Sequence, residues 1–224
     1  WRTLIPDLRG LGRSDAPDLG YSMATYADDL AALLDAVGVD DVVLAGLSMG
    51  GYVAFEFLRR HRPRVRALVL ADTRAQADSA EGRKAREAAM ADAREGGAPL
   101  IAEQMLPKLL AKGAPDSLRD EVRAMMAAAP VPGILGALAA MRDRPDSTEG
   151  LPTLGGLPTL VVVGAEDALT PPKDAEGMAK AIPGAKLAII PGAGHLAPLE
   201  QPKAFNQHLQ TLLTRLGESP SPTG

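Results

Sequence analysis

The sequence predicts an α/β fold, a mostly parallel sheet flanked by helices, with a helical insertion. In residues 1–72 and 151–216, short apolar runs alternate with stretches of helical periodicity, as in strands joined by crossover helices. Residues 73–150 break this rhythm, because alanine-rich segments with charged residues at helical spacing follow one another without a strand. A chain of 224 residues is long enough for one such domain with a sizeable core.

The first half of the core is predicted to hold three strands and two helices. The strands are short apolar runs, and the helices are longer stretches in which apolar residues recur at helical spacing. In chain order they are a strand at residues 3–6, a helix at 25–37, a strand at 42–45, a helix from about 51 to 60 and a strand at 67–71.

Residues 73–150 are predicted to form three or four short helices that make a cap over the edge of the sheet. Gly and Pro punctuate the segment at 96–99, 113–115 and 130–133. Its methionines would either line a pliable apolar pocket or, as we expect for most of them, pack the helices together. They are Met90, Met105, Met125, Met126 and Met141.

The second half of the core is predicted to resume the alternation. Apolar runs at residues 159–164 and 185–190 predict two further buried parallel strands. Thr-Pro-Pro at 170–172 predicts the start of a helix, and a last helix contains His208. Residues 217–224, rich in Ser and Pro, are predicted to be a disordered tail.

The most informative motif is Gly-Leu-Ser-Met-Gly at residues 46–50, between a predicted strand and a predicted helix. A strand, a tight turn with serine at its apex and a helix form an elbow, which raises a serine hydroxyl out of a sheet. Gly46 and Gly50 predict a strained turn in which strand and helix approach too closely for side chains. Ser48 is therefore the candidate nucleophile, although glycine and serine also favour turns that have no chemical role.

An acid and a histidine, Asp167 and His195, each follow a later predicted strand. Because active sites of open α/β sheets gather at the carboxyl ends of the strands, we expect both to lie beside Ser48. An imidazole can take the proton of a serine, and a carboxylate fixes the tautomer of the ring. The backbone N–H of Met49, at the start of the helix, would point at the developing oxyanion.

Three histidines compete for the role of the base. His61 stands at the end of a helix, where a cation is favourable and a proline marks the stop. His208 is expected on a solvated face of the last helix. His195 alone stands on a glycine-rich loop after a strand, so it is the preferred base.

The acid also has a rival. Asp72 follows the strand at residues 67–71 and would face the same edge of the sheet, or it would merely cap the next segment. Asp167 is preferred because it comes after the lid-like insertion. Glu166 lies beside Asp167 in the sequence and is expected to point elsewhere.

Together these motifs resemble the serine hydrolases of the α/β-hydrolase fold, close to the enol-lactonase, esterase and cofactor-free perhydrolase group. The resemblance covers residues 1–216 and rests on the loop at 6–15, the motif at 46–50, Gly-Ala-Glu-Asp at 164–167 and Gly-Ala-Gly-His at 192–195. It implies hydrolysis of a small carboxylic ester or lactone through an acyl-serine, with no cofactor and no metal.

Two alternatives stay open beside that activity. One is a perhydrolase or cofactor-free haloperoxidase with the same triad, and the other is a catalytically weak, truncated protein that acts by association. Related haloalkane dehalogenases and epoxide hydrolases carry Asp at the position of Ser48, so those activities are disfavoured. For the acid, the resemblance favours Asp167, the commoner placement, although some relatives place theirs where Asp72 stands.

The resemblance further implies several N-terminal strands, one with a His-Gly loop that gives a second oxyanion N–H, and the sequence lacks them. Without an internal strand, unpaired backbone groups cost about 1–3 kcal/mol each. A longer gene product, a partner chain, or pairing of residues 3–6 with the elbow strand would resolve this. In the third case a backbone N–H near Leu8 or Arg9 would replace the donor. An exposed sheet edge would also favour a homo-oligomer.

Composition narrows the remaining classes. The formal net charge is −4, cysteine is absent and the three histidines are scattered, which argues against disulfides, a thiol mechanism and a metal site. Five arginines between residues 59 and 66 are expected to form a solvated surface, not a nucleic-acid site. No apolar stretch approaches membrane-spanning length and no signal peptide is visible. We therefore expect a cytoplasmic enzyme without a nucleic-acid or membrane partner, although a preceding segment could hold a signal.

Overall fold

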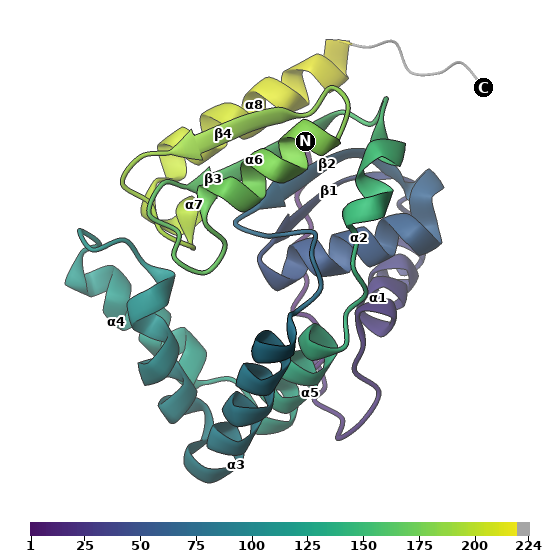
Figure 1. The fold of residues 1–224 in the computed structure, drawn as a ribbon. Helices are drawn as coiled ribbons and strands as arrows, with labels where there is room; N and C mark the ends of the chain where they lie inside the picture. Colours follow the sequence, from purple (N-terminus) through teal and green to yellow (C-terminus); the bar gives the residue numbers. More distant parts are fainter. Residues whose placement is uncertain (219–224) are drawn as a thin grey trace.

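In the computed structural model, which describes residues 1–218, a four-stranded parallel sheet is flanked by helices on both faces (Figure 1). The strands stand in the order β1-β2-β3-β4, and each pairs in parallel with its neighbour. The predicted α/β class is therefore confirmed. The strands are β1 (Val42–Leu47), β2 (Val65–Ala71), β3 (Thr159–Gly164) and β4 (Lys186–Ile190).

Helices pack on the two faces of the sheet and bury its side chains. Leu70 and Val161 face a cluster shared with α1, α2 and α6, whereas Val69 and Val162 face a cluster shared with α8. Because both faces are covered, β2 and β3 are apolar at nearly every position. The helices are α1 (Met23–Ala36), α2 (Met49–His61), α6 (Pro172–Ala181), the short α7 (Ala197–Glu200) and α8 (Pro202–Glu218), with a 3-10 turn η1 (Arg62–Arg64) after α2.

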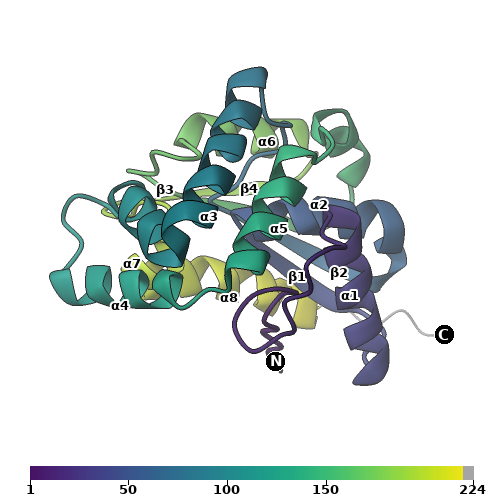
Figure 2. The ribbon, with the colours of Figure 1, turned by 90° about the horizontal axis from the view of Figure 1, so that it is seen from below.

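The segment between β2 and β3 contains three helices, which lie together on one side of the sheet (Figures 1 and 2). They are α3 (Ala80–Leu109), α4 (Asp116–Ala127) and α5 (Val131–Arg142), and the 3-10 helix η2 (Thr148–Leu154) leads back to β3. Gly97, with φ 67° and ψ −165°, divides α3 into two helical parts. The segment matches the expected short helices, and its division from the core at residues 73–150 stays an interpretation.

The methionines of this segment mostly pack against other helices. Met90 is buried, and Met105 and Met126 pack on the apolar cluster between α3 and α4. Met141 packs on a cluster that includes residues of α2, while Met125 is exposed. These positions agree with the packing role that was expected for most of them.

Two helices begin earlier than the sequence pattern predicts, and both starts have a local cause. Ser22 caps α1, because its Oγ accepts the backbone N–H of Thr25 at 3.0 Å. Helix α2 begins at Met49, directly after the serine of the elbow. The first N–H groups of α2, which have no acceptor within the helix, therefore stand beside that serine.

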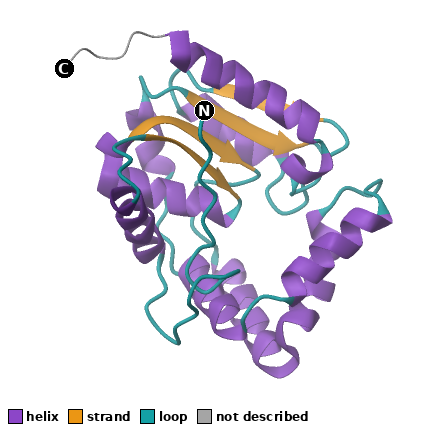
Figure 3. Ribbon diagram, turned by 180° about the vertical axis from the view of Figure 1, so that it is seen from behind, coloured by secondary structure: helices purple, strands orange, loops and turns teal. Residues whose placement is uncertain are grey.

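The prediction of a strand at residues 3–6 is wrong. This segment is coil, shown as loop in Figure 3, and Ile5 is 87% exposed. Among the described residues β1 pairs only with β2, so the suggested pairing of residues 3–6 with the elbow strand is wrong too. A strand needs backbone pairing as well as apolar composition, and in the described chain no backbone hydrogen bond joins residues 3–6 to a strand.

The predicted disordered tail begins too early. Helix α8 continues through Gly217 to Glu218, because its apolar face is anchored on the sheet by buried Leu212 and Leu216. The remaining residues, 219–224, lie outside the described part of the chain.

Within residues 1–218, no single helix combines the length and apolar character needed to cross a membrane. The pair α4 and α5 reaches that length and composition only when taken together, and it is bent by 95° at the break.

Candidate active site

Ser48 stands at a strained turn between β1 and α2. Its φ of 52° and ψ of −115° place a residue with a Cβ in the left-handed region, which is sparsely populated and persists only when the surroundings enforce it. The end of β2 provides that enforcement. The backbone N–H of Ser48 donates to the carbonyl of Ala71 at 2.9 Å, and the hydroxyl of Thr73 donates to the carbonyl of Ser48 at 2.8 Å.

Glycines permit the close approach at this turn, at one of the two positions that the motif suggests and at one that it does not. A Cβ on Gly46 would lie 2.2 Å from the carbonyl oxygen of Gly50, so a side chain there is excluded. A Cβ on Gly50 would meet nothing within 4 Å, so the steric role predicted for Gly50 is wrong. The second crowded position is Gly51, where a Cβ would lie 2.4 Å from Oγ1 of Thr73.

The three predicted site residues are brought together in one hydrogen-bonded chain. Nε2 of His195 lies 2.8 Å from Oγ of Ser48, and Nδ1 of His195 lies 2.9 Å from Oδ2 of Asp167. Each residue directly follows a strand or its short loop: Ser48 after β1, Asp167 after β3 and His195 after β4. Asp167 and His195 are each only 3% exposed, so water is excluded from their contact.

Asp167 is held as a carboxylate. Burial alone would raise its pKa, but hydrogen bonds from His195 and Thr170 outweigh burial and lower the pKa below its usual value. Thr170 Oγ1 donates to Oδ2 at 2.6 Å, and the N–H groups of Leu169 and Thr170 donate to Oδ1 at 2.8 and 2.9 Å. A carboxylate can only accept, so Nδ1 of His195 carries the proton and Nε2 is free to accept from Ser48.

Sequence reasoning assigned no role in the site to Thr170 or Thr73, which support the acid and the elbow. Thr170 follows Asp167 by three residues, the spacing at which an Asp side chain bonds backbone groups and a nearby hydroxyl. That spacing was a usable signal. Thr73 contacts Ser48 across 25 positions of the sequence, and no local pattern marks such a contact.

The rival acid, Asp72, does not reach the imidazole. It is fully buried, and its Oδ1 accepts the N–H of Gly164 at 2.8 Å, while Oδ2 has no hydrogen-bond partner. Burial raises the pKa of Asp72 to about 8, with the N–H of Gly164 acting in the opposite direction and the charge of Asp167 adding to the rise. Asp72 is thus largely neutral at pH 7. It does not cap the next helix either, since Ser79 caps α3.

The other candidates lie elsewhere in the fold. Nε2 of His61 bonds Asp28 at 2.8 Å at the end of α2, and His208 is exposed on α8. Glu166 is exposed, and its Oε2 accepts the backbone N–H of Lys112 at 3.3 Å. Within residues 1–218, no three His, Asp or Glu side chains gather in a way that could hold a metal ion.

The arginine-rich stretch after the elbow helix is paired with acidic side chains. Four of its members form ion pairs, which neutralise much of their positive charge. The pairs are Arg59–Glu56, Arg60–Asp28, Arg64–Asp35 and Arg66–Asp41. The expectation that this surface binds no nucleic acid stays a prediction.

The N-terminal loop comes near the elbow without a recorded hydrogen bond to it. Leu8 and Met49 pack on the same apolar cluster, which contains Tyr52 and Val53 of α2. The side chain of Arg9 is held by Asp29 through two hydrogen bonds of 2.8 and 2.6 Å. An oxyanion donor from Leu8 or Arg9 stays a prediction. The open cleft of about 770 Å³ between this loop and α1 is not lined by any of the three site residues.

Comparison with known proteins agrees with this fold. The family model described as alpha/beta hydrolase fold matches residues 1–202. A thermophilic esterase from Thermogutta terrifontis, solved with malate bound, is 42% identical with a TM-score of 0.91, covering 94% of this chain and 79% of that one. The enol-lactonase from Burkholderia xenovorans is 26% identical with a TM-score of 0.83, covering 92% and 78%.

One relative found by sequence comparison is named for an activity other than ester or lactone hydrolysis. A Mycobacterium tuberculosis protein named for a non-heme bromoperoxidase, BpoC, is 30% identical over 214 residues, or 92% of this chain and 80% of the relative. The chain is therefore similar to proteins named as an esterase, an enol-lactonase and a bromoperoxidase. The esterase and the enol-lactonase support a hydrolase. The match over most of its length shows that the chain belongs to the α/β hydrolase fold family.

Proposed function

We propose that the protein is a serine hydrolase that cleaves small carboxylic esters or lactones through an acyl-Ser48 intermediate. One observation carries the proposal: the continuous hydrogen-bonded chain from Ser48 through His195 to Asp167, with contacts of 2.8 and 2.9 Å. A serine hydroxyl is a weak nucleophile alone, and an adjacent base oriented by a third group is the arrangement that activates it.

In the acylation step, Oγ of Ser48 attacks the carbonyl carbon of the ester while Nε2 of His195 takes the hydroxyl proton. Asp167, kept ionised by its hydrogen bonds, stabilises the imidazolium. The negative charge on the carbonyl oxygen meets the backbone N–H of Met49, at the positive end of α2. The intermediate then collapses, the imidazolium protonates the departing alkoxide, and acyl-Ser48 remains.

In the deacylation step, water takes the place of the alcohol. His195 accepts a proton from water, the resulting hydroxide adds to the acyl carbonyl, and the tetrahedral intermediate releases the carboxylic acid. The proton on His195 returns to Oγ of Ser48, which restores the starting state.

A second candidate is acyl transfer to hydrogen peroxide instead of water. It is supported by the 30% identity to the protein named for a non-heme bromoperoxidase. The same triad serves, because peroxide replaces water as the nucleophile, gives up its proton to His195 and leaves as the peracid. Measuring peracid formation beside ester cleavage separates the two activities.

The test is burst kinetics on p-nitrophenyl acetate. Wild-type protein is expected to release a burst of nitrophenol, and Ser48→Ala to lose on the order of 10⁴-fold or more in turnover. Ser117→Ala is the matched control, since Ser117 is exposed on α4, and it is expected to keep wild-type kinetics.

If wild type and Ser48→Ala cleave the ester equally slowly, the hydrolase proposal fails. The alternative of a catalytically weak protein that acts by association would then gain support. Sedimentation of the wild-type protein over a range of concentrations would test that alternative directly.

A further inference from the structure

Glu200, the last residue of α7, joins two parts of the chain that are far apart in the sequence. Its Oε1 accepts the backbone N–H of Gly194 at 2.7 Å, next to His195. Its Oε2 accepts the backbone N–H of Ala111 at 2.7 Å, just after α3. One carboxylate thus holds both the histidine loop and residues 109–112, which we term the cap clasp.

The cap clasp also touches the histidine itself. The backbone N–H of His195 donates to the carbonyl of Leu109 at 2.9 Å. A Cβ on Gly194 would lie 2.6 Å from the backbone nitrogen of Ala111, so the two backbones are in direct contact. The position of the imidazole therefore depends on the end of α3 as well as on its own loop.

A carboxylate suits this place because each of its two oxygens accepts one backbone N–H, both at 2.7 Å. Glu200 also lies near Asp72, since its charge is among those that raise the pKa of Asp72, after burial and the charge of Asp167. Only an ionised carboxylate accepts two N–H groups with both oxygens at full strength. A neutral amide would turn its NH₂ group toward one of the two donors.

We propose that Glu200 is a positioning residue that couples the cap clasp to His195 and so keeps Nε2 in line with Oγ of Ser48. This inference rests on the proposed function, because it assigns His195 the role of the base. Small displacements of a reacting group are expensive: an error of about 1 Å can cost on the order of 100-fold in rate.

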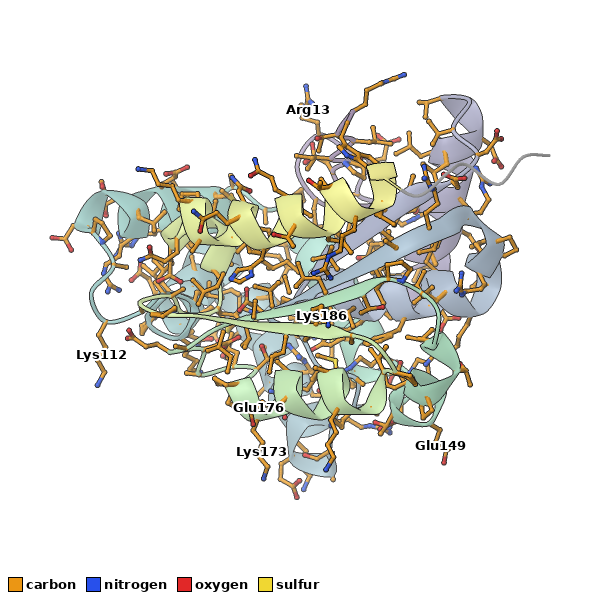
Figure 4. The ribbon with its side chains drawn as sticks, turned by 90° about the horizontal axis from the view of Figure 1, so that it is seen from above. Arg13, Lys112, Glu149, Lys173, Glu176 and Lys186 are labelled. Carbon is orange, nitrogen blue, oxygen red and sulfur yellow. The ribbon has the colours of Figure 1, made fainter. Side chains whose placement is uncertain are left out.

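Glu166 provides a matched control within the same contact. Its carboxylate also accepts a backbone N–H of the cap clasp, that of Lys112, but at 3.3 Å and with a single recorded bond. Glu166 is exposed, and the side chain of Lys112 points away from the protein (Figure 4). Replacing this carboxylate by an amide removes a negative charge beside the cap clasp but leaves both bonds of Glu200 in place.

The experiment measures the acylation rate constant of Glu200→Ala, Glu200→Gln and Glu166→Gln from the burst phase with p-nitrophenyl acetate. Burst amplitude counts competent sites, so a partly unfolded preparation does not distort the rate constant. We expect a loss of about 10- to 100-fold for Glu200→Ala, a smaller loss for Glu200→Gln, and a rate within about twofold of wild type for Glu166→Gln.

A second readout does not depend on activity. Hydrogen exchange followed by NMR is expected to speed up at the amides of Gly194 and Ala111 in both Glu200 variants, and to stay unchanged there in Glu166→Gln. If the Glu200 variants lose only thermal stability while the rate constant per site and these amides are unchanged, the coupling is refuted. If wild type shows no burst and equals Ser48→Ala, the proposed function fails, and the exchange data alone decide whether Glu200 couples the two segments.

Discussion

Strands β1 and β3 deliver a proposed catalytic side chain to the same edge of the sheet, yet they are buried very differently. All six residues of β3 are buried, whereas in β1 only Gly46 is buried and Ala45 is exposed. Strand β3 pairs on both sides, and β1 pairs on one side among the described residues. The two residues are therefore held at the sheet edge in different ways. The strand before Asp167 is fixed by packing, whereas Ser48 is fixed by hydrogen bonds with the end of β2.

A second contrast concerns the two buried carboxyls that follow β2 and β3, Asp72 and Asp167. Asp167 collects hydrogen bonds and stays ionised, whereas Asp72 has one unpartnered oxygen and a pKa raised to about 8, mainly by burial. Neighbouring carboxyls whose pKa values are pushed apart take different roles. The ionised one can stabilise an imidazolium, and the neutral one holds the backbone of Gly164.

The largest expected effect separates these two carboxyls by substitution. Asp167→Asn removes the acceptor that orients His195, so kcat is expected to fall by ~10⁴-fold. Asp72→Asn replaces a neutral carboxyl by a neutral amide that still accepts the N–H of Gly164, so kcat is expected to stay within about tenfold of wild type. Steady-state kinetics with circular dichroism as a folding control compare the two, and equal losses would erase the distinction.

The next effect is a stability that depends on pH through Asp72. Its carboxyl ionises near pH 4 when unfolded but near pH 8 when folded. The folded protein therefore holds the proton of Asp72 more tightly than the unfolded chain does. The stability that this carboxyl contributes is complete below pH 4, falls between pH 4 and 8 by up to about 1.4 kcal/mol per pH unit, and is gone above pH 8. Asp72→Asn has no carboxyl to titrate at this position. The free energy of unfolding of the variant therefore increases relative to that of wild type as pH rises.

Urea unfolding of both proteins at pH 5, 7 and 9 measures the gap between them, that is, the difference in their free energies of unfolding. The lowered pKa of Asp167 acts in the opposite direction, with stability lost as pH falls below about 4, but Asp167 is present in both proteins and cancels. A gap that is constant across these pH values would show that Asp72 titrates normally in the folded protein.

A third prediction compares packing in the two strands directly. Leu160 of β3 is buried between the sheet and α8, so Leu160→Ala is expected to lower the free energy of unfolding by about 2–5 kcal/mol. Leu44 of β1 is only partly buried, so Leu44→Ala is expected to cost about 1 kcal/mol. Urea denaturation at one pH gives both values. Equal costs would mean that β1 is as well covered in solution as β3.

The sequence was sufficient for the strands that are buried and for the order of the site residues. Continuous apolar runs located β3 within the same bounds as the structure, because burial on both faces leaves a one-dimensional signal. The elbow at Ser48 and the loops of Asp167 and His195 were found because each follows an apolar run. Among the three strands before them, burial on both faces holds for β3 only, since β1 is mostly half-buried and β4, predicted to be buried, is exposed at Lys186, Leu187 and Ile189. Their meeting at one edge follows from parallel topology alone.

What could not be predicted depends on contacts across long separations. The clamp of Thr73 on Ser48 and the bridge of Glu200 from Gly194 to Ala111 join segments 25 to 89 residues apart. The neutral state of Asp72 likewise depends on a burial that no local pattern records. The strand expected at residues 3–6 was wrong because pairing, unlike propensity, needs a neighbour.

The smallest expected effect tests the exposed side of the comparison. Ile5 projects from the N-terminal coil and is 87% exposed, so Ile5→Lys is expected to change the free energy of unfolding by no more than about 0.5 kcal/mol. Hydrogen exchange at the amides of β1 should also be unaffected. A loss above 1 kcal/mol, with faster exchange in β1, would show that residues 3–6 cover the open edge of that strand in solution. Ser48 would then depend on packing from both sides, as Asp167 does, and the contrast between the two strands would disappear.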